Sequence, residues 1–178
     1  MKTNRIGKLA LGGVFSALAV VFLLLTLTPV ATVGTAALAA LCGIPVVMEL
    51  GRKVGWLHFA AVAVLSLLII PAWEGKLMYV CFFGWYTVGK AWLEQRSLPR
   101  WGEYLIKIVA FWAALAVWGV LCYHLLSPAL PRWFGWWMLP VAGGVLTAVF
   151  LVYDRCLSGL ATVYWHRFHP MVRRLFRF

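Results

Sequence analysis

Charged side chains are scarce in this chain of 178 residues. They make up 12% of the sequence, whereas water-soluble domains carry about 25%. Only five residues are acidic, against 16 lysines and arginines, and 64% of the chain is hydrophobic. This composition excludes a water-soluble globular domain and makes lipid the solvent of the protein.

Signatures of catalysis, metal binding and disulfides are also missing. The sequence contains no G-x-S-x-G, no H-E-x-x-H and no phosphate-binding glycine loop with its lysine. The four cysteines form no C-x-x-C pair and lie in apolar runs, and His166 and His169 have no further metal ligand nearby. We therefore predict no catalytic residue, no metal site and no cofactor.

The net charge of +11 is not the mark of a nucleic-acid partner. Nucleic-acid binding needs basic residues gathered on one soluble face, and here they stand in short breaks between apolar runs. Such a pattern is typical of the connections between membrane-spanning helices, so we expect no nucleic acid among the partners.

What the sequence does contain is a series of long apolar runs. A hydrocarbon core of about 30 Å needs roughly 20 helical residues. The predicted fold is therefore all-α, a single domain over residues 1–178 with six transmembrane helices and a basic amphipathic tail. The spans are expected at about 9–28, 30–50, 54–73, 77–92, 104–126 and 138–157, with the tail at 158–178.

The distribution of lysine and arginine predicts the orientation of this bundle. With six spans, 14 of these residues fall on the side of the two termini, and only Lys76 and Arg132 fall on the other. The positive-inside rule then places both termini in the cytoplasm of a bacterial cell with the protein in its cytoplasmic membrane. The first apolar run is longer than the core of a signal peptide, so we expect it to be retained. The tail is expected to lie on membrane lipid.

Ionisable side chains near helix ends are the first candidates for a site, because burying such a group in a bilayer is costly. Glu49, Lys90 and Asp154 stand near the cytoplasmic ends of three helices. They are predicted either to form one buried charge network that holds helices or a polar ligand, or to pair as helix-end charges with Arg52, Lys53 or Arg155. His58 is expected to join this network or to bond to a backbone carbonyl. Glu94 and Glu103 are expected to be solvated.

A second candidate site lies at the opposite membrane surface. Glu74, Tyr79, His124 and Trp133 combine polar groups with aromatic rings, as small-molecule sites do. Anchoring of aromatic rings at the membrane interface explains the same residues without a ligand.

The first span also carries small residues within one helical turn of each other. Gly12, Gly13, Ser16 and Ala17 would let another helix approach closely, since packing of small residues drives helix association in lipid. The six-helix size and the stretch LALGGVFSALAVVFLLL resemble the substrate-binding S-components of energy-coupling factor (ECF) transporters. The resemblance implies that Gly13 and Ala17, with Gly12 and Ser16, dock a transmembrane coupling subunit that works with ATPases. The stretches MYVCFFGWYTVGKAW and VYDRCLSGL also resemble uncharacterised membrane proteins of Gram-positive bacteria.

Three functions follow as hypotheses. The first is a small-molecule-binding membrane subunit of a nutrient uptake transporter, energised by partner subunits, with an unknown ligand. The second is a membrane scaffold of the bacterial cell envelope that recruits enzymes through its tail. The third is a lipid or polyprenyl-phosphate-handling protein, in which Lys90, Lys107 and Arg155 meet an anionic head and the aromatic fourth span meets a chain.

Overall fold

The computed structural model describes residues 3–27, 32–94, 99–126 and 138–169, and every regular element in these ranges is a helix. The elements are α1 (Thr3–Leu24), η1 (Leu25–Leu27), α2 (Thr32–Leu41), α3 (Gly43–Leu50), α4 (Arg52–Ile69), α5 (Trp73–Met78), η2 (Tyr79–Phe83), α6 (Gly84–Glu94), α7 (Arg100–Leu126), α8 (Met138–Val163) and η3 (Tyr164–Phe168). The all-α prediction is confirmed.

Five helical stretches are long and apolar enough to cross a bilayer. They are Gly7–Leu27, Thr32–Leu50, Arg52–Ile69, Trp101–Leu121 and Val141–Phe168. Large apolar side chains on their outer surfaces, among them Leu9, Leu68 and Val152, are more than 60% exposed. So much exposed apolar surface is unfavourable in water but suits contact with lipid tails. These features indicate a multi-pass membrane protein.

The expected span at 77–92 is not among these five stretches. It lies in the continuous helical segment α5–η2–α6, which contains a π-helical turn at η2. Lys76 and Lys90 leave only residues 77–89 between them, about 20 Å of helix against a hydrocarbon core of about 30 Å. The uncharged part of this segment is therefore short for a membrane-spanning helix.

Glycine and proline set the boundaries around α4. Gly51 adopts a left-handed backbone conformation with φ of 85°, which glycine tolerates without a steric penalty. Its amide donates to the carbonyl of Val47 at 3.1 Å and closes the end of α3. At the other end, Pro71 follows Ile70, the extended residue that ends α4, because a residue before proline avoids the helical region.

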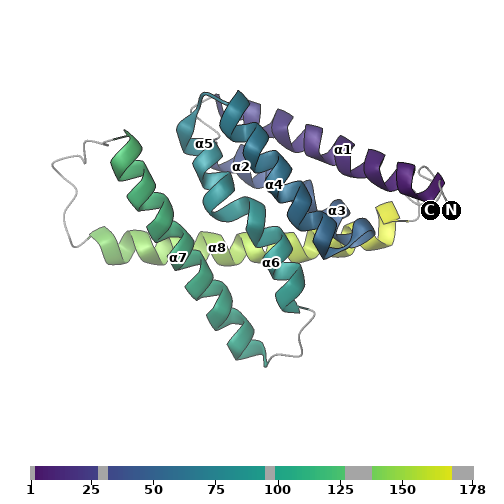
Figure 1. The fold of residues 1–178 in the computed structure, drawn as a ribbon. Coiled ribbons are helices and arrows are strands. Elements are labelled where there is room, and N and C mark those ends of the chain that lie inside the picture. Colours follow the sequence, from purple (N-terminus) through teal and green to yellow (C-terminus); the bar gives the residue numbers. More distant parts are fainter. Residues whose placement is uncertain (1–2, 28–31, 95–98, 127–137, 170–178) are drawn as a thin grey trace.

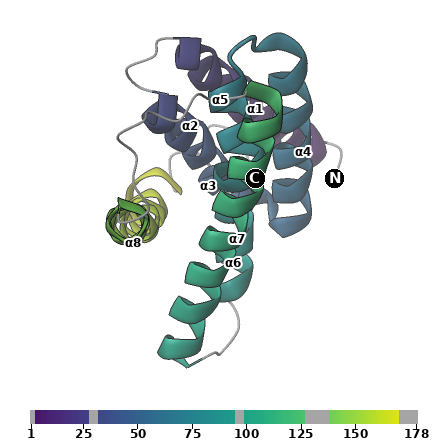
Figure 2. The same cartoon turned by 90° about the vertical axis from the view of Figure 1, so that its left-hand side faces the viewer.

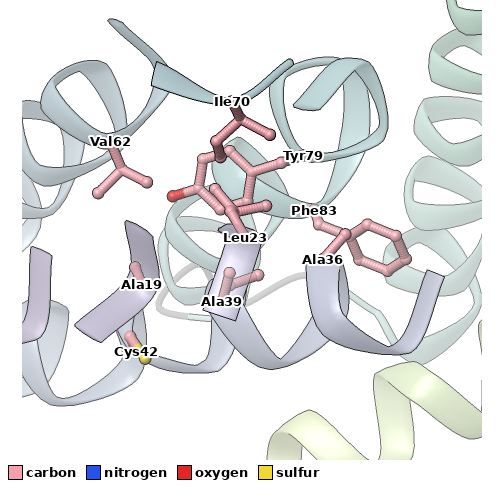
Figure 3. Close-up of a cluster of buried hydrophobic side chains, with 10 residues drawn as sticks. Ala19, Leu23, Ala36, Ala39, Cys42, Val62, Ile70, Tyr79 and Phe83 are labelled. Atoms are coloured by element: carbon pink, nitrogen blue, oxygen red, sulfur yellow. The ribbon is translucent and has the colours of Figure 1, made fainter. Parts of the chain in front are cut away.

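The first core joins α1, α2, α4 and η2 through small residues facing large ones. Figure 3 shows Ala19, Ala36 and Ala39 beside Leu23 and Tyr79, all of them almost completely buried. The alanines allow these helices to approach closely, and the Tyr79 ring fills the space between them. The N-terminal half of the chain is thereby packed around its aromatic segment.

The second core joins α3, α6, α7 and α8 and is mainly aromatic. The rings of Phe111 and Phe150 stack with centroids 4.6 Å apart, and Phe82 and Tyr86 pack against them. Figures 1 and 2 show that α7 and α8 cross steeply, since Figure 2 views α8 along its axis while α7 runs down the page. The large rings therefore fill a crossing between two long helices.

The C-terminal helix is longer than expected. α8 continues to Val163 and passes into a second π-helical turn, η3, so the helical segment extends at least to His169 and not only to residue 157. Residues 158–168, expected to begin the tail, continue the helix of α8, and the buried Leu157 and Tyr164 extend its packed face. Residues 170–178 of the expected tail lie outside the described residues.

Candidate functional site

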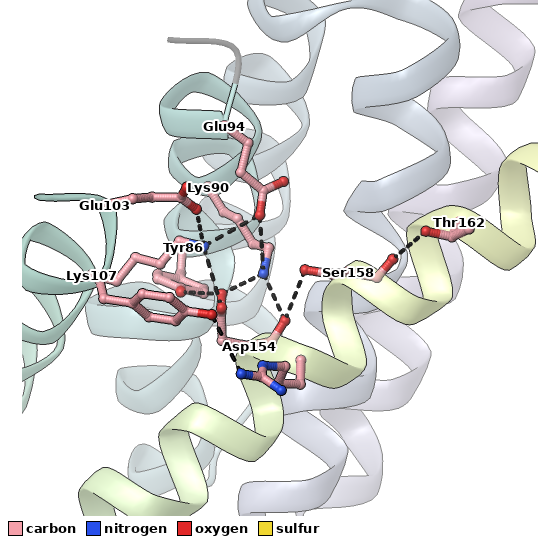
Figure 4. A network of polar contacts seen from close by, with 10 residues as sticks. Tyr86, Lys90, Glu94, Glu103, Lys107, Asp154, Ser158 and Thr162 are labelled. Carbon is pink, nitrogen blue, oxygen red and sulfur yellow. Dashed lines mark hydrogen bonds and ion pairs between the residues drawn. The ribbon is translucent and has the colours of Figure 1, made fainter. Parts of the chain in front are cut away.

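Asp154 on α8 is the centre of a buried cluster of charged side chains (Figure 4). It is only 5% exposed. Its carboxylate accepts a hydrogen bond from the Tyr86 hydroxyl at 2.6 Å, forms an ion pair with Lys90, and accepts from the Lys107 ammonium at 3.3 Å. Asp154 therefore binds side chains from both α6 and α7.

Two glutamates complete this cluster around the lysines. Lys107 pairs with Glu103 at 2.6 Å and with Glu94 at 3.3 Å, while Lys90 lies 3.4 Å from Glu94. The expectation that Glu94 and Glu103 are merely solvated is wrong, although Glu94 remains 41% exposed. The two pairs Lys90–Glu94 and Glu103–Lys107 have the i, i+4 spacing that places side chains on one helix face. This i, i+4 spacing could have indicated both ion pairs from the sequence alone.

The charge cluster, defined as Lys90, Glu94, Glu103, Lys107 and Asp154, holds three carboxylates and two ammonium groups. At neutral pH its formal balance is one negative charge. An anionic lipid head would meet lysines that carboxylates already neutralise, which argues against the lipid-head role expected of Lys90 and Lys107. The surplus negative charge favours binding of a cationic group at this site.

The other residues expected in this network lie elsewhere. Glu49 on α3 accepts from the Tyr164 hydroxyl at 3.2 Å and pairs with His169 at 2.5 Å. It thus binds the helical continuation of α8 and forms no hydrogen bond or ion pair with Lys90 or Asp154. Arg155 is exposed, with Nη2 at 3.5 Å from the Tyr104 hydroxyl. The structure therefore brings Lys90 and Asp154 together and keeps Glu49 and Arg155 apart from them.

His58 binds the first helix instead of the charge cluster or a backbone carbonyl. Its Nδ1 lies 2.8 Å from the Ser16 hydroxyl, and its Nε2 is buried with no hydrogen-bond partner among the described residues. Ser16 belongs to the stretch of small residues expected to dock a partner. One residue of that stretch therefore faces α4 within the protein.

The stretch of small residues on α1 is divided between two faces. A Cβ placed on Gly12 would lie 3.7 Å from Leu50, whereas one on Gly13 would meet nothing within 4 Å. Gly13 and Ala17 are exposed, while Gly12 and Ser16 are partly covered. Gly13 and Ala17 are thus the two residues that another helix can reach.

Among the residues expected at an outer mouth, the structure describes Glu74, Tyr79 and His124, and it does not place all three at the surface. Tyr79 is 1% exposed and belongs to the first core, while Glu74 and His124 are exposed. Trp133 lies outside the described residues. Lys76, near Glu74, is buried: its ammonium donates to the Ile70 carbonyl at 2.8 Å and lies 3.6 Å from the centre of the Trp73 ring.

Beside the charge cluster lies a cavity of about 240 Å³ between α3, α6 and α8, here named the polar-walled cavity. Its polar wall is formed by Thr87, Lys90 and Glu94, and its apolar wall includes Met48 and Ala161. Small-molecule sites have this composition, a mostly apolar lining with a few convergent polar groups. No metal-binding group of three or more ligands occurs in the ranges that the structure describes.

A second cavity, of about 220 Å³, lies between α2, η2, α7 and α8 and is named the apolar cavity. Its walls include the rings of Phe82, Phe111, Phe150, Trp118 and Tyr153, and no charged side chain lines it. Met78, Phe82 and Phe83 of the aromatic segment expected to meet a hydrocarbon chain therefore line this cavity, whereas Lys90 and Lys107, expected to bind the head, do not.

Comparison with known proteins gives no further guide to function: no family model, no curated protein and no solved structure matches the chain.

Proposed function

We propose that this protein is the small-molecule-binding membrane subunit of a nutrient uptake transporter, energised by separate partner subunits in the bacterial cytoplasmic membrane. The observation that carries the proposal is the polar-walled cavity, because it places Lys90, Glu94 and Thr87 against an apolar wall. A site of this kind binds a ligand through few directed contacts while its apolar walls exclude water.

The cavity and its charges suggest the class of ligand. A volume of about 240 Å³ is below the usual range of about 300–1,000 Å³ for drug-sized ligands, so the ligand is small. Glu94 is the most exposed carboxylate of the charge cluster, and its side chain also lines the cavity. With three carboxylates and two ammonium groups nearby, a ligand bearing one amine group would balance the cluster.

The outward face of α1 supports docking of a partner. Gly13 and Ala17 are exposed on a helix that is apolar enough to span the bilayer, and no described residue lies within 4 Å of the position that a Cβ on Gly13 would take. Small exposed residues let a second helix approach closely in lipid. A coupling subunit with its ATPases is the partner that the proposal requires, because the sequence has no phosphate-binding loop of its own.

The proposal includes six crossings with both termini in the cytoplasm. In this arrangement α5–η2–α6 crosses the bilayer with its short apolar part shielded by neighbouring helices. The exposed Arg52 and Lys53 then lie on the cytoplasmic side, as the positive-inside rule requires.

Filling the polar-walled cavity tests the proposal. Ala161→Phe adds a ring to the cavity wall, and Ala148→Phe makes the same change on an exposed, lipid-facing position of the same helix. Native mass spectrometry of protein extracted gently from its own host membrane should detect a small polar ligand in the wild type and in A148F. In A161F the bound fraction should fall at least tenfold, an effect of about 1.4 kcal/mol or more.

The same spectrum records protein partners. A wild-type protein that carries no small ligand, or an A161F variant that binds it as well as A148F does, would refute the assigned site. A complex with envelope-synthesis enzymes and no coupling subunit would favour the scaffold hypothesis in its place.

A further inference from the structure

The apolar cavity has no part in the function proposed above. Its volume of about 220 Å³ exceeds that of an apolar cavity of about 150 Å³ that binds benzene in another protein. Phe82, Phe111 and Phe150 form aromatic walls in mutual contact, and none of the described lining residues is charged. Apolar cavities stay free of water, so an occupant must supply hydrocarbon surface.

One side of this cavity opens toward the lipid-facing surface. Val33 on α2 and Val149 on α8 both line the cavity and are 50% and 57% exposed. Gly34, beside Val33, has no neighbour within 4 Å of the position a Cβ would take. In a bilayer the molecules in contact with this opening are the lipids themselves.

Two hydrogen-bond donors belong to the walls of the cavity. Trp118 Nε1 and the Tyr153 hydroxyl are buried and have no hydrogen-bond partner in the described part of the chain. Thr87 lies beside Tyr153, but its hydroxyl is directed to the carbonyl oxygens of Ala40 and Phe83 at 3.3 and 3.4 Å. A buried donor left without an acceptor is costly, so the occupant is expected to bring an acceptor oxygen.

The position of Trp118 along α7 helps to identify the acceptor group of the occupant. Trp118 lies three residues from the end of the Trp101–Leu121 span, about 4.5 Å along the helix axis. We place this level at the border between the hydrocarbon core and the interface, where indole rings of tryptophan are favoured. From there the cavity continues inward to Phe82 and Tyr153, which lies near the middle of the Val141–Phe168 span.

We propose that the apolar cavity holds one acyl chain of a membrane phospholipid, whose ester carbonyl accepts a hydrogen bond from the Trp118 indole N–H. The chain fills the aromatic cavity through dispersion contacts, and the carbonyl satisfies the buried donor at the interface. No charged partner is required, in agreement with an uncharged lining. The bound lipid acts as a structural ligand that fills the crossing of α7 and α8.

Competition between an ester lipid and an ether lipid tests the proposal. The purified full-length protein is reconstituted in vesicles with equal amounts of dioleoyl phosphatidylcholine and its dialkyl ether analogue, which lacks the carbonyl oxygens. After mild re-extraction, native mass spectrometry should show one retained phospholipid per protein, with the ester form favoured about threefold, the effect of one neutral hydrogen bond.

Two variants separate the cavity from the general lipid surface. Ala114→Phe fills the cavity and should abolish retention, whereas Ala113→Phe on the exposed face of the same helix should not. Trp118→Phe keeps an aromatic ring but removes the N–H group, so this variant should retain the lipid without preferring the ester form. Equal retention in A114F and A113F, or no ester preference in the wild type, would overturn the proposal. If A114F does not fold, the comparison of W118F with the wild type decides it.

Discussion

At the scale of single residues, Asp154 is a buried carboxylate that contacts three polar side chains. It accepts hydrogen bonds from Tyr86 and Lys107 and pairs with Lys90, and Lys90 also donates to its backbone carbonyl at 2.6 Å. Burying these charges is costly, and only their mutual pairing offsets the cost. Asp154 therefore stabilises the junction of α6, α7 and α8 as long as both lysines keep their partner.

Replacing Asp154 by asparagine should strongly destabilise the protein. Asp154→Asn keeps the size of the side chain but removes the buried carboxylate that pairs with Lys90 and Lys107, which leaves Lys90 with only the more exposed Glu94 at 3.4 Å. Breaking a buried pair in this way costs about 3–5 kcal/mol. Thermal unfolding in detergent micelles should show a markedly lower midpoint. Arg155→Gln, an exposed neighbour on the same helix, is the matched control and should unfold close to the wild type. Equal midpoints for D154N and R155Q would show that the cluster does not hold the helices together.

Sequence reasoning identified part of this cluster. Lys90 and Asp154 were recognisable because each is an ionisable residue close to an apolar run. Glu49 was placed with them because depth along a helix can be read from the sequence, whereas rotation about the helix axis cannot. Its partners turned out to be Tyr164 and His169, on a helical extension that the sequence analysis had assigned to the tail.

At the scale of elements, α1 presents two different faces. Ser16 faces inward and bonds to His58, while Gly13 and Ala17 are exposed on the outward face and are not covered by the described part of the chain. Internal packing and partner docking can therefore be altered separately on one helix.

A bulky residue at Gly13 should disrupt docking without disturbing the fold. Gly13→Leu has free space for its side chain, as does the control Gly144→Leu on α8, where a Cβ would also meet nothing within 4 Å. In pull-down from host membranes, G13L should lose most of the coupling subunit that the wild type and G144L retain, because the partner helix can no longer approach closely. A G13L variant that keeps its partner would place the docking surface elsewhere.

Element boundaries were largely predictable where glycine and proline stand. Gly51 and Pro71 enclose α4 at Arg52–Ile69, within about four residues of the span expected at 54–73, because their backbone preferences act locally. The two π-helical turns, η2 and η3, were not predicted. They reflect the packing of large side chains such as Tyr79 and Tyr164 between helices, which no local pattern of the sequence describes.

At the scale of the whole molecule, the number of bilayer crossings depends on the segment α5–η2–α6. Five stretches satisfy the length and apolarity of a span, and α5–η2–α6 does not. Its buried lysines are nevertheless neutralised or capped within the protein: Lys90 by the charge cluster and Lys76 by the Ile70 carbonyl. Protein contacts therefore replace much of the lipid contact that a span ordinarily makes.

Labelling of single cysteines decides the number of crossings. In a cysteine-free background, Lys53→Cys and Glu74→Cys mark the two sides of α4, and Pro99→Cys follows α6; all three positions are exposed. Six crossings predict that a membrane-impermeant thiol reagent labels P99C from the same side as K53C. Labelling together with E74C would establish five crossings and place the two termini on opposite sides.

The distance along the chain between Lys90 and Asp154 has a consequence for biosynthesis. Their pairing spans 64 positions, so α6 enters the membrane well before the ribosome has made its α8 partner. Until then Lys90 has only Glu94, one turn away, to compensate its charge. The cluster is complete only once α8 has been inserted, and a nascent chain interrupted before Asp154 carries an unfinished polar surface that membrane quality-control proteases can recognise.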